Sequence, residues 1–232
     1  MSFTQDDYKR FMANALKGRD DTFRFECKMC GKCCRRREKP IIINGADTFR
    51  MAKALGVPVE KAILEHTKAH LGDATHALVI TLKERLDGSC SLLRKGHCMI
   101  QDAKPAVCAL FPLGRMMDMR SGEIIYFNNQ DSCIGGSTEK VWTLGEWLYM
   151  FHAEETEHMS AAWNKLFTGI SALTAKMAVK NVTDEMQAVM AHVLYFNYDT
   201  SRDFYEQIEE NKEIAKKTFW DEFHRKINYD LR

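Results

Sequence analysis

Short apolar runs, several of them alternating with polar residues, characterise the first 137 residues of the chain. Leu78, Ile80 and Leu82 alternate within residues 76–86, which is typical of a half-buried strand. Similar runs, separated by turn residues, predict further strands and hairpins at residues 40–43, 90–93, 98–101, 113–119 and 123–128. Apolar residues at helical spacing, together with capping and helix-ending residues, predict short helices at residues 4–17, 47–55, 58–70 and 105–110. In the second of these, Asp47 is the predicted cap and Gly56 the residue that ends the helix.

From about Glu139 onward the apolar pattern becomes helical. Turn residues separate predicted helices near 139–157, 158–179, 184–196 and 201–227. We therefore predict an α+β fold, with Gly135-Gly136-Ser137 at the boundary between its two main parts. The expected units are an N-terminal helix at 1–20, a small irregular cysteine-rich metal domain with short hairpins at 21–137, and a mainly α-helical bundle at 138–232.

Length and composition indicate a cytoplasmic protein. A chain of 232 residues can bury a core without disulfide bonds. No apolar run approaches the ~20 residues that span a bilayer, and the acidic, polar start lacks the apolar segment of a secretory signal, so no membrane partner is expected. In a reducing compartment, clustered cysteines indicate metal binding or catalysis rather than disulfide bonds.

Four of the eight cysteines lie within Cys27-Lys28-Met29-Cys30-Gly31-Lys32-Cys33-Cys34. Two thiols separated by two residues can bind one metal ion, because a tight turn brings both sulfurs to one side. The Cys27-x-x-Cys30-Gly31 spacing resembles a zinc knuckle, whereas its extension to Cys33 resembles the run that ligates an iron–sulfur cube. Adjacent side chains diverge, so one of Cys33 and Cys34 either binds no metal or belongs to a second site.

The remaining cysteines are too widely spaced to chelate locally and must converge through the fold; they are Cys90, Cys98, Cys108 and Cys133. Eight thiols make two four-thiolate sites, or one site with spare cysteines. Instead of binding metal, Cys133 and one of the Cys33-Cys34 pair could be ordinary buried cysteines.

The part of the chain that contains all eight cysteines is also the more basic part. Residues 1–137 carry 22 Lys and Arg against 16 Asp and Glu, whereas residues 138–232 carry 11 against 16. Basic side chains near thiolates would offset the negative charge of a metal–thiolate site. Nucleic acid is not an expected partner, because the basic residues have no aromatic interleaving and no known binding motif.

Several motifs together carry a resemblance over about residues 23–137: Phe25-x-Cys27-x-x-Cys30-Gly31-x-Cys33-Cys34, Cys90 with Cys98-x-Ile100, Lys104-Pro105-x-x-Cys108-x-x-Phe111-Pro112, and Cys133-x-Gly135. They are similar to the CxxCxxCC cysteine-cluster family (YkgJ-type), which is described as a zinc- or iron-chelating domain. All eight cysteines fall on the pattern, so the resemblance implies a metal site built from them. The chain departs from the family where Lys104 and Ala109 replace the usual Arg and where Ile134 replaces a common Pro.

Two functional hypotheses remain open, and with them the question whether the protein is an enzyme. The first is an iron–sulfur protein, with a 4Fe–4S cluster favoured, that has redox or modifying activity. Because one branch of the family includes flagellin lysine N-methylases, the resemblance implies methylation of a protein or peptide substrate with S-adenosylmethionine. The second is a zinc-stabilised, non-catalytic protein-interaction module. The sequence identifies no catalytic residue and no oligomeric state.

Other candidate groups carry less weight. Arg35-Arg36-Arg37 could grip a carboxylate or phosphate, but charge balance on a solvated loop explains the run better. Glu155 and His158 share one face of a predicted helix, which is half of a carboxylate-bridged di-iron pattern. The sequence contains no second Glu-x-x-His, so a solvated helix face is preferred. His97, next to Cys98, is a minor candidate ligand.

Overall fold

The computed structural model describes residues 9, 11–35, 40–117, 124–129, 133 and 138–218, and its architecture is α+β, as predicted. The strands are β1 (Ala15–Leu16), β2 (Thr22–Arg24), β3 (Ile42–Ile43), β4 (Thr67–Leu71), β5 (Leu78–Leu82), β6 (Leu93–Arg94), β7 (His97–Cys98), β8 (Leu113–Met117), β9 (Ile124–Asn128) and β10 (Val141–Thr143). The α-helices are α2 (Gly45–Leu55), α3 (Val59–His66), α4 (Ala106–Leu110), α5 (Leu144–Met150), α6 (Ala153–Thr174), α7 (Asp184–Ala191) and α8 (Phe204–Ala215). Shorter turns are η1 (Lys32–Cys34), η2 (Gln101–Ala103), η4 (Val179–Asn181) and the π-helix η5 (His192–Phe196).

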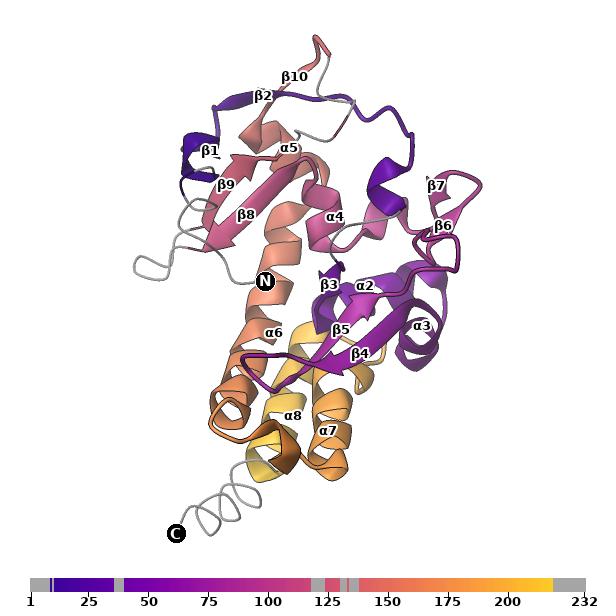
Figure 1. Ribbon diagram of the computed structural model, residues 1–232, viewed down its shortest axis with the longest axis vertical. Coiled ribbons are helices and arrows are strands. Elements are labelled where there is room, and N and C mark those ends of the chain that lie inside the picture. Colours follow the sequence, from indigo (N-terminus) through magenta and orange to yellow (C-terminus); the bar gives the residue numbers. More distant parts are fainter. Residues whose placement is uncertain are drawn as a thin grey trace.

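The strands pair in small antiparallel sheets, whose orders are β1-β9-β8, β3-β5-β4, β10-β2 and β6-β7. The sheet β1-β9-β8 and the pair β10-β2 lie in the upper part of Figure 1, and β3-β5-β4 lies beside α2 and α3. The long helix α6 runs from the upper part towards α7 and α8. The predicted strand at β5 and the predicted hairpins β6-β7 and β8-β9 are confirmed.

The predicted N-terminal helix over residues 4–17 is too long. Lys9 and residues 11–13 are helical, but Ala15 and Leu16 form β1 and pair with Phe127 and Tyr126 of β9. Pairing with the edge of an existing hairpin satisfies the backbone groups of β1, and no periodicity within the segment reveals it. Residues 1–8 and 10 lie outside the described residues.

The predicted helix over 58–70 ends early, at His66. Thr67 is extended, with φ −128° and ψ 164°, and residues 67–71 pair along the whole length of β5 as β4. Thr is β-branched and suits a strand, and the adjacent edge of β5 offers backbone partners that a continued helix would forgo.

The boundaries of the predicted helices near 139–157 and 158–179 are also wrong, because this stretch forms the strand β10 and the helices α5 and α6. Residues 141–143 form β10 on β2, and Thr143 then caps α5 in a capping box with Glu146. His152 has a left-handed backbone with φ 48°, which separates α5 from α6. Further on, Asp203 caps α8, whereas the prediction began that helix at residue 201 and extended it beyond the described residues.

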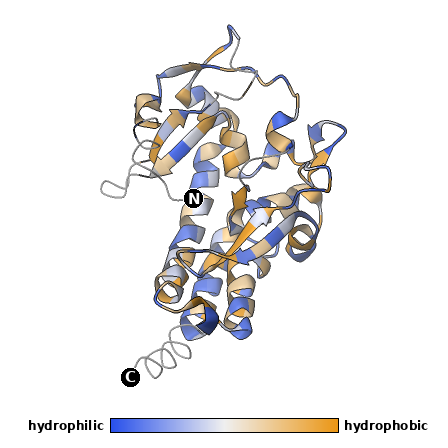
Figure 2. Ribbon diagram, viewed as in Figure 1, coloured by the Kyte–Doolittle hydropathy of each residue, from blue (hydrophilic) through white to orange (hydrophobic). Residues whose placement is uncertain are grey.

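Two hydrophobic cores hold these elements together. The larger one joins β3 and β5 to the C-terminal helices and contains Ile43, Ile80, Leu194 and Ile208; the apolar strand β5 is orange in Figure 2. The smaller one surrounds Trp147 and draws on β2, β8, α4 and α5. Each core contains residues from both sides of residue 137, and the predicted division into domains stays a prediction. The boundary Gly135-Gly136-Ser137 lies outside the described residues.

Within the described ranges, no helix is both long and apolar enough to cross a membrane.

The first turn of α2 packs closely against the helical part at Gly45. A Cβ atom there would lie 2.4 Å from both the Leu194 carbonyl oxygen and Trp163 Nε1. Those two atoms already form a hydrogen bond of 2.8 Å, with Trp163 as the donor. Only a residue without a side chain therefore allows α2, α6 and η5 to meet at this point.

Gly45→Ala should lower the free energy of unfolding by about 2–4 kcal/mol, because the added methyl overpacks the junction and strains the Trp163 hydrogen bond. Gly169→Ala is the matched control, since a Cβ atom at this α6 position meets nothing within 4 Å. It should stabilise the protein by about 0.5–1 kcal/mol through helix propensity. Urea denaturation of both variants measures the difference, and equal midpoints would contradict the proposed close packing.

Candidate metal centre

The short turn η1 positions Cys33 and Cys34. Gly31 enters it with a left-handed backbone at φ 67°. The Cys90 amide donates a hydrogen bond of 2.7 Å to the Cys34 carbonyl, and Arg35 forms a β-bridge with Ser89. Backbone contacts therefore hold η1 against the loop that carries Cys90, although even the nearest bridged residues, Arg35 and Ser89, are 54 positions apart in the sequence.

Cys98 and Cys108 reach the same region from other elements. Cys98 lies on β7, paired with Leu93 of β6 across the hairpin. Cys108 lies on α4, and its amide donates to the Pro105 carbonyl at 2.8 Å. Pro105 precedes the first residue of α4, where its fixed φ and missing N–H suit the start of a helix.

Cys90 lies within the larger core, and Cys34, Cys98 and Cys108 pack against that core. The Sγ atoms of Cys33 and Cys34 lie 3.8 Å apart. This contact, followed by burial and by the charges of Cys33, Cys90 and Cys108, raises the pKa of the Cys34 thiol far above its ordinary value. Burial raises the pKa of Cys98, with smaller contributions from Cys90 and Cys33, while the Lys104 ammonium acts in the opposite direction.

The other three predicted ligands are carried by different segments. Cys27 and Cys30 are exposed on the loop between β2 and η1, and Cys27 Sγ lies 3.7 Å from Met29 Sδ. Cys133 is half-buried against the smaller core, whereas the gathered thiols border the larger one. The contacts described above therefore place Cys33, Cys34, Cys90, Cys98 and Cys108 in one region, and the ligand role of all eight cysteines stays a prediction.

All eight cysteines lie in the described ranges, and each is a thiol rather than half of a disulfide. Among the described residues, no group of three or more His, Cys, Asp or Glu side chains is spaced to hold one metal ion as it stands. The donor set nevertheless fits a thiophilic metal, because soft thiolates select zinc and iron–sulfur clusters. Metal binding would have to draw the thiols closer together.

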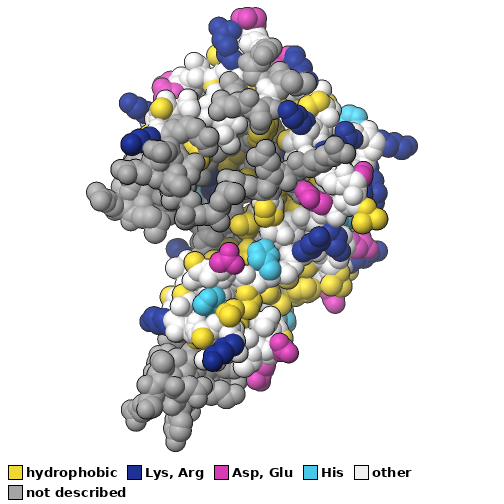
Figure 3. Space-filling model, in the orientation of Figure 1, with side chains coloured by type: hydrophobic (Ala, Val, Ile, Leu, Met, Phe, Trp, Pro, Cys, Tyr) yellow, Lys and Arg dark blue, Asp and Glu magenta, His cyan; other side chains and the backbone are white. Residues whose placement is uncertain are grey.

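The minor candidates lie at the surface. His97 is exposed on β7, opposite Arg94. Arg35 is exposed at the end of η1, while Arg36 and Arg37 lie outside the described residues. Glu155 and His158 are both exposed on α6. Figure 3 shows Lys and Arg side chains around the edge of the upper half of the molecule.

A buried carboxylate anchors the chain next to Cys108. Asp47 was predicted to be the cap of α2, but Asn44 is the cap, and Asp47 completes the capping box by accepting from the Asn44 amide. Asp47 Oδ1 also accepts from the Ala106 amide at 2.9 Å, at the start of α4. The Asp47 side chain therefore joins α2 to the helix that carries Cys108.

Arg50, one turn further along α2, completes this network. It lies 3.3 Å from Asp47 Oδ1, donates to the Lys104 carbonyl, and donates to Thr156 Oγ1 on α6 at 2.6 Å. Burial raises the pKa of Asp47, while Arg50 and the backbone N–H groups of Ala106 and Asn44 counter that rise. Arg50 was not predicted as a site residue, and the local signal for the pair is its i,i+3 spacing from Asp47.

A family comparison covers this region. Residues 26–133, which include all eight cysteines, match the CxxCxxCC family, described as "Putative zinc- or iron-chelating domain". Comparison with curated proteins and with solved structures gave no match.

Asp47→Asn should lower the free energy of unfolding by about 3–5 kcal/mol, because it leaves the Arg50 guanidinium without its anionic partner in a largely buried position. Asp73→Asn, at an exposed position, is the control and should change stability by less than about 0.5 kcal/mol. Guanidinium denaturation followed by circular dichroism measures both. If the two variants unfold at the same concentration, the Asp47–Arg50 pair is not a main support of this part of the fold.

Proposed function

We propose that the segment matching the zinc- or iron-chelating family forms a thiolate metal centre in a cytoplasmic protein. The observation that carries the proposal is the gathering of thiols from separate parts of the chain. The thiols proposed as the main ligands are those of Cys33, Cys34, Cys90, Cys98 and Cys108. Thiols that lie in one region of the fold are chemically suited to a soft metal.

The exposed loop before η1 supplies the next candidate ligands. Cys27 and Cys30 lie five and two positions before the first residue of η1, and neither belongs to the larger or the smaller core. They can approach the gathered thiols without unpacking a buried side chain. Cys133 packs against the smaller core, so we propose it as a ligand of lower priority.

An iron–sulfur cluster is the favoured occupant. One zinc ion and one 4Fe–4S cluster each take four thiolates, so the number of thiols suits either of them. Cys-x-x-Cys-x-x-Cys spacing is typical of cluster ligation. When bound, such a cluster supplies one-electron transfer or structural support. The role of the chain is to hold the thiolates, and Lys104 beside Cys98 offsets part of their charge.

Zinc is the second candidate, and the gathered thiols favour it in one respect. They contain enough sulfur atoms for one closed four-thiolate site, with one cysteine left over. The protein would then be a zinc-stabilised module rather than a redox protein. In either case much of the rigidity of the loops at η1, residue 90 and β6-β7 would come from the metal, because these segments have few strands of their own.

Purification without oxygen should yield a brown protein that contains iron and acid-labile sulfide and whose visible absorption is bleached by dithionite. Visible spectroscopy and elemental analysis measure the result. A colourless protein with stoichiometric zinc would contradict the iron–sulfur assignment and support the zinc-stabilised module. A folded protein that binds neither iron nor zinc would contradict the metal centre as a whole.

Cys34→Ser and Cys90→Ser should each lose most of the bound metal and unfold at a lower temperature, since a structural metal site contributes folding free energy. Cys27→Ser and Cys30→Ser test the exposed loop in the same way. Met29→Leu, which keeps the bulk of a side chain between these two cysteines, should retain the metal. Elemental analysis and thermal melts provide the measurements, and full metal content in both Cys34→Ser and Cys90→Ser would refute the ligand assignment.

A further inference from the structure

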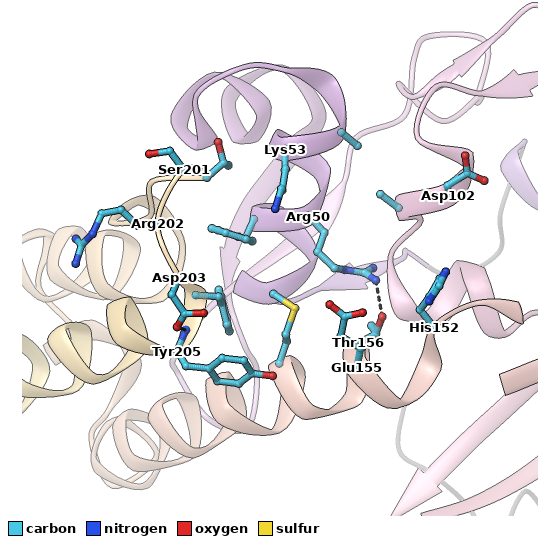
Figure 4. Close-up of a pocket in the computed structure, with 16 residues that line it drawn as sticks. Arg50, Lys53, Asp102, His152, Glu155, Thr156, Ser201, Arg202, Asp203 and Tyr205 are labelled. Carbon is cyan, nitrogen blue, oxygen red and sulfur yellow. Dashed lines mark hydrogen bonds between the residues drawn. The ribbon is translucent and has the colours of Figure 1, made fainter. Parts of the chain in front are cut away.

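A cavity lies between α2, α6 and the start of α8, outside the group of thiols (Figure 4). Its volume is about 650 Å³, within the range of sites that hold small molecules. Its walls include Lys53 of α2, Glu155 of α6 and Asp102 of η2. None of these residues is a proposed metal ligand, so the cavity is a separate feature of the molecule.

Buried apolar side chains form part of the cavity lining. Phe49, Met159 and Phe204 are 5%, 7% and 3% exposed, respectively. The rings of Phe49 and Phe204 lie 5.2 Å apart, and Phe204 in turn stacks on Tyr198. Packing from several elements fixes these side chains, so this part of the lining is preformed and does not depend on a ligand for its shape.

Most charged groups around the cavity already have partners within the protein. Arg50 pairs with Asp47, and Arg202 pairs with Glu210. Asp203 accepts the first amides of α8 as its cap. These side chains are engaged in holding the fold together, which removes them as first candidates for ligand contacts.

Lys53 and Glu155 differ from these groups. In the part of the chain that the structure describes, neither side chain has a hydrogen bond or an ion pair, with the other or with a third residue. Figure 4 shows Lys53 reaching in from α2 and Glu155 from α6, with Asp102 and His152 nearer the Glu155 side. Opposite charges that face one concave, partly apolar space create adjacent regions of positive and negative potential.

We infer that this cavity binds a small zwitterion with an apolar body, of the α-amino acid type. Its carboxylate would contact Lys53, its ammonium group would contact Glu155, and its side chain would lie on Phe49, Met159 and Phe204. Such a molecule contacts Lys53 and Glu155 at once, whereas a singly charged ligand pairs with only one of these two exposed side chains. The inference goes beyond the metal centre and does not depend on it.

Titration of the full-length, metal-loaded protein with three matched probes tests this inference. L-phenylalanine carries both charges, 3-phenylpropionate lacks the amine, and phenethylamine lacks the carboxylate. Amide resonances of the cavity residues, followed by NMR, should shift with L-phenylalanine. Each singly charged analogue should bind at least about tenfold more weakly, which corresponds to about 1.4 kcal/mol for the lost charged contact.

Variants then assign each charge. Lys53→Met should weaken L-phenylalanine and 3-phenylpropionate but leave phenethylamine unchanged, and Glu155→Gln should do the reverse for the two analogues. Lys61→Met and Glu60→Gln, at exposed positions on α3, are the matched controls and should change nothing. Equal binding of L-phenylalanine and 3-phenylpropionate would overturn the zwitterion assignment. A lack of shifts with millimolar L-phenylalanine, L-leucine and L-methionine would overturn the site itself.

Discussion

Asp47 and Arg50, on one turn of α2, hold together parts of the molecule that lie far apart in the sequence. Asp47 accepts from the amide that begins α4, and Arg50 reaches the Lys104 carbonyl and Thr156 of α6. A buried carboxylate is unfavourable by itself, and these hydrogen bonds with the adjacent guanidinium offset its desolvation. The helix that carries Cys108 and the long helix α6 therefore keep fixed positions relative to α2.

The segment between Cys98 and Cys108 connects the two candidate sites. Its first turn, η2, lines the cavity through Asp102, and its end forms α4 beside the thiols. Lys104 lies between them, with its carbonyl bonded to Arg50 and its ammonium group near Cys98. Arg50 and Asp47 hold this segment in place through hydrogen bonds to the Lys104 carbonyl and the Ala106 amide.

Local patterns predicted the elements that carry their own signal. The alternation of β5, the turn of β6-β7 and the Gly56 stop of α2 are properties of adjacent residues, and all three predictions hold. The misses are short edge strands: β1, β4 and β10 were predicted as helix, and they pair with residues 7 to 121 positions away. Such segments of two to five residues take their conformation from a partner strand, which tertiary contacts provide.

The sequence by itself determined the α+β class and the thiolate chemistry, because composition, periodicity and cysteine spacing are local and chemical properties. The tertiary structure decided which thiols meet, since Cys34, Cys90, Cys98 and Cys108 become neighbours only when η1, the β6-β7 hairpin and α4 pack together. It also decided that Arg50 is buried and that Lys53 and Glu155 face one cavity. The burial of Arg50 and the position of the cavity depend on how helices far apart in the sequence pack against one another. The periodicity of a single segment carries no information about which other segment it will contact.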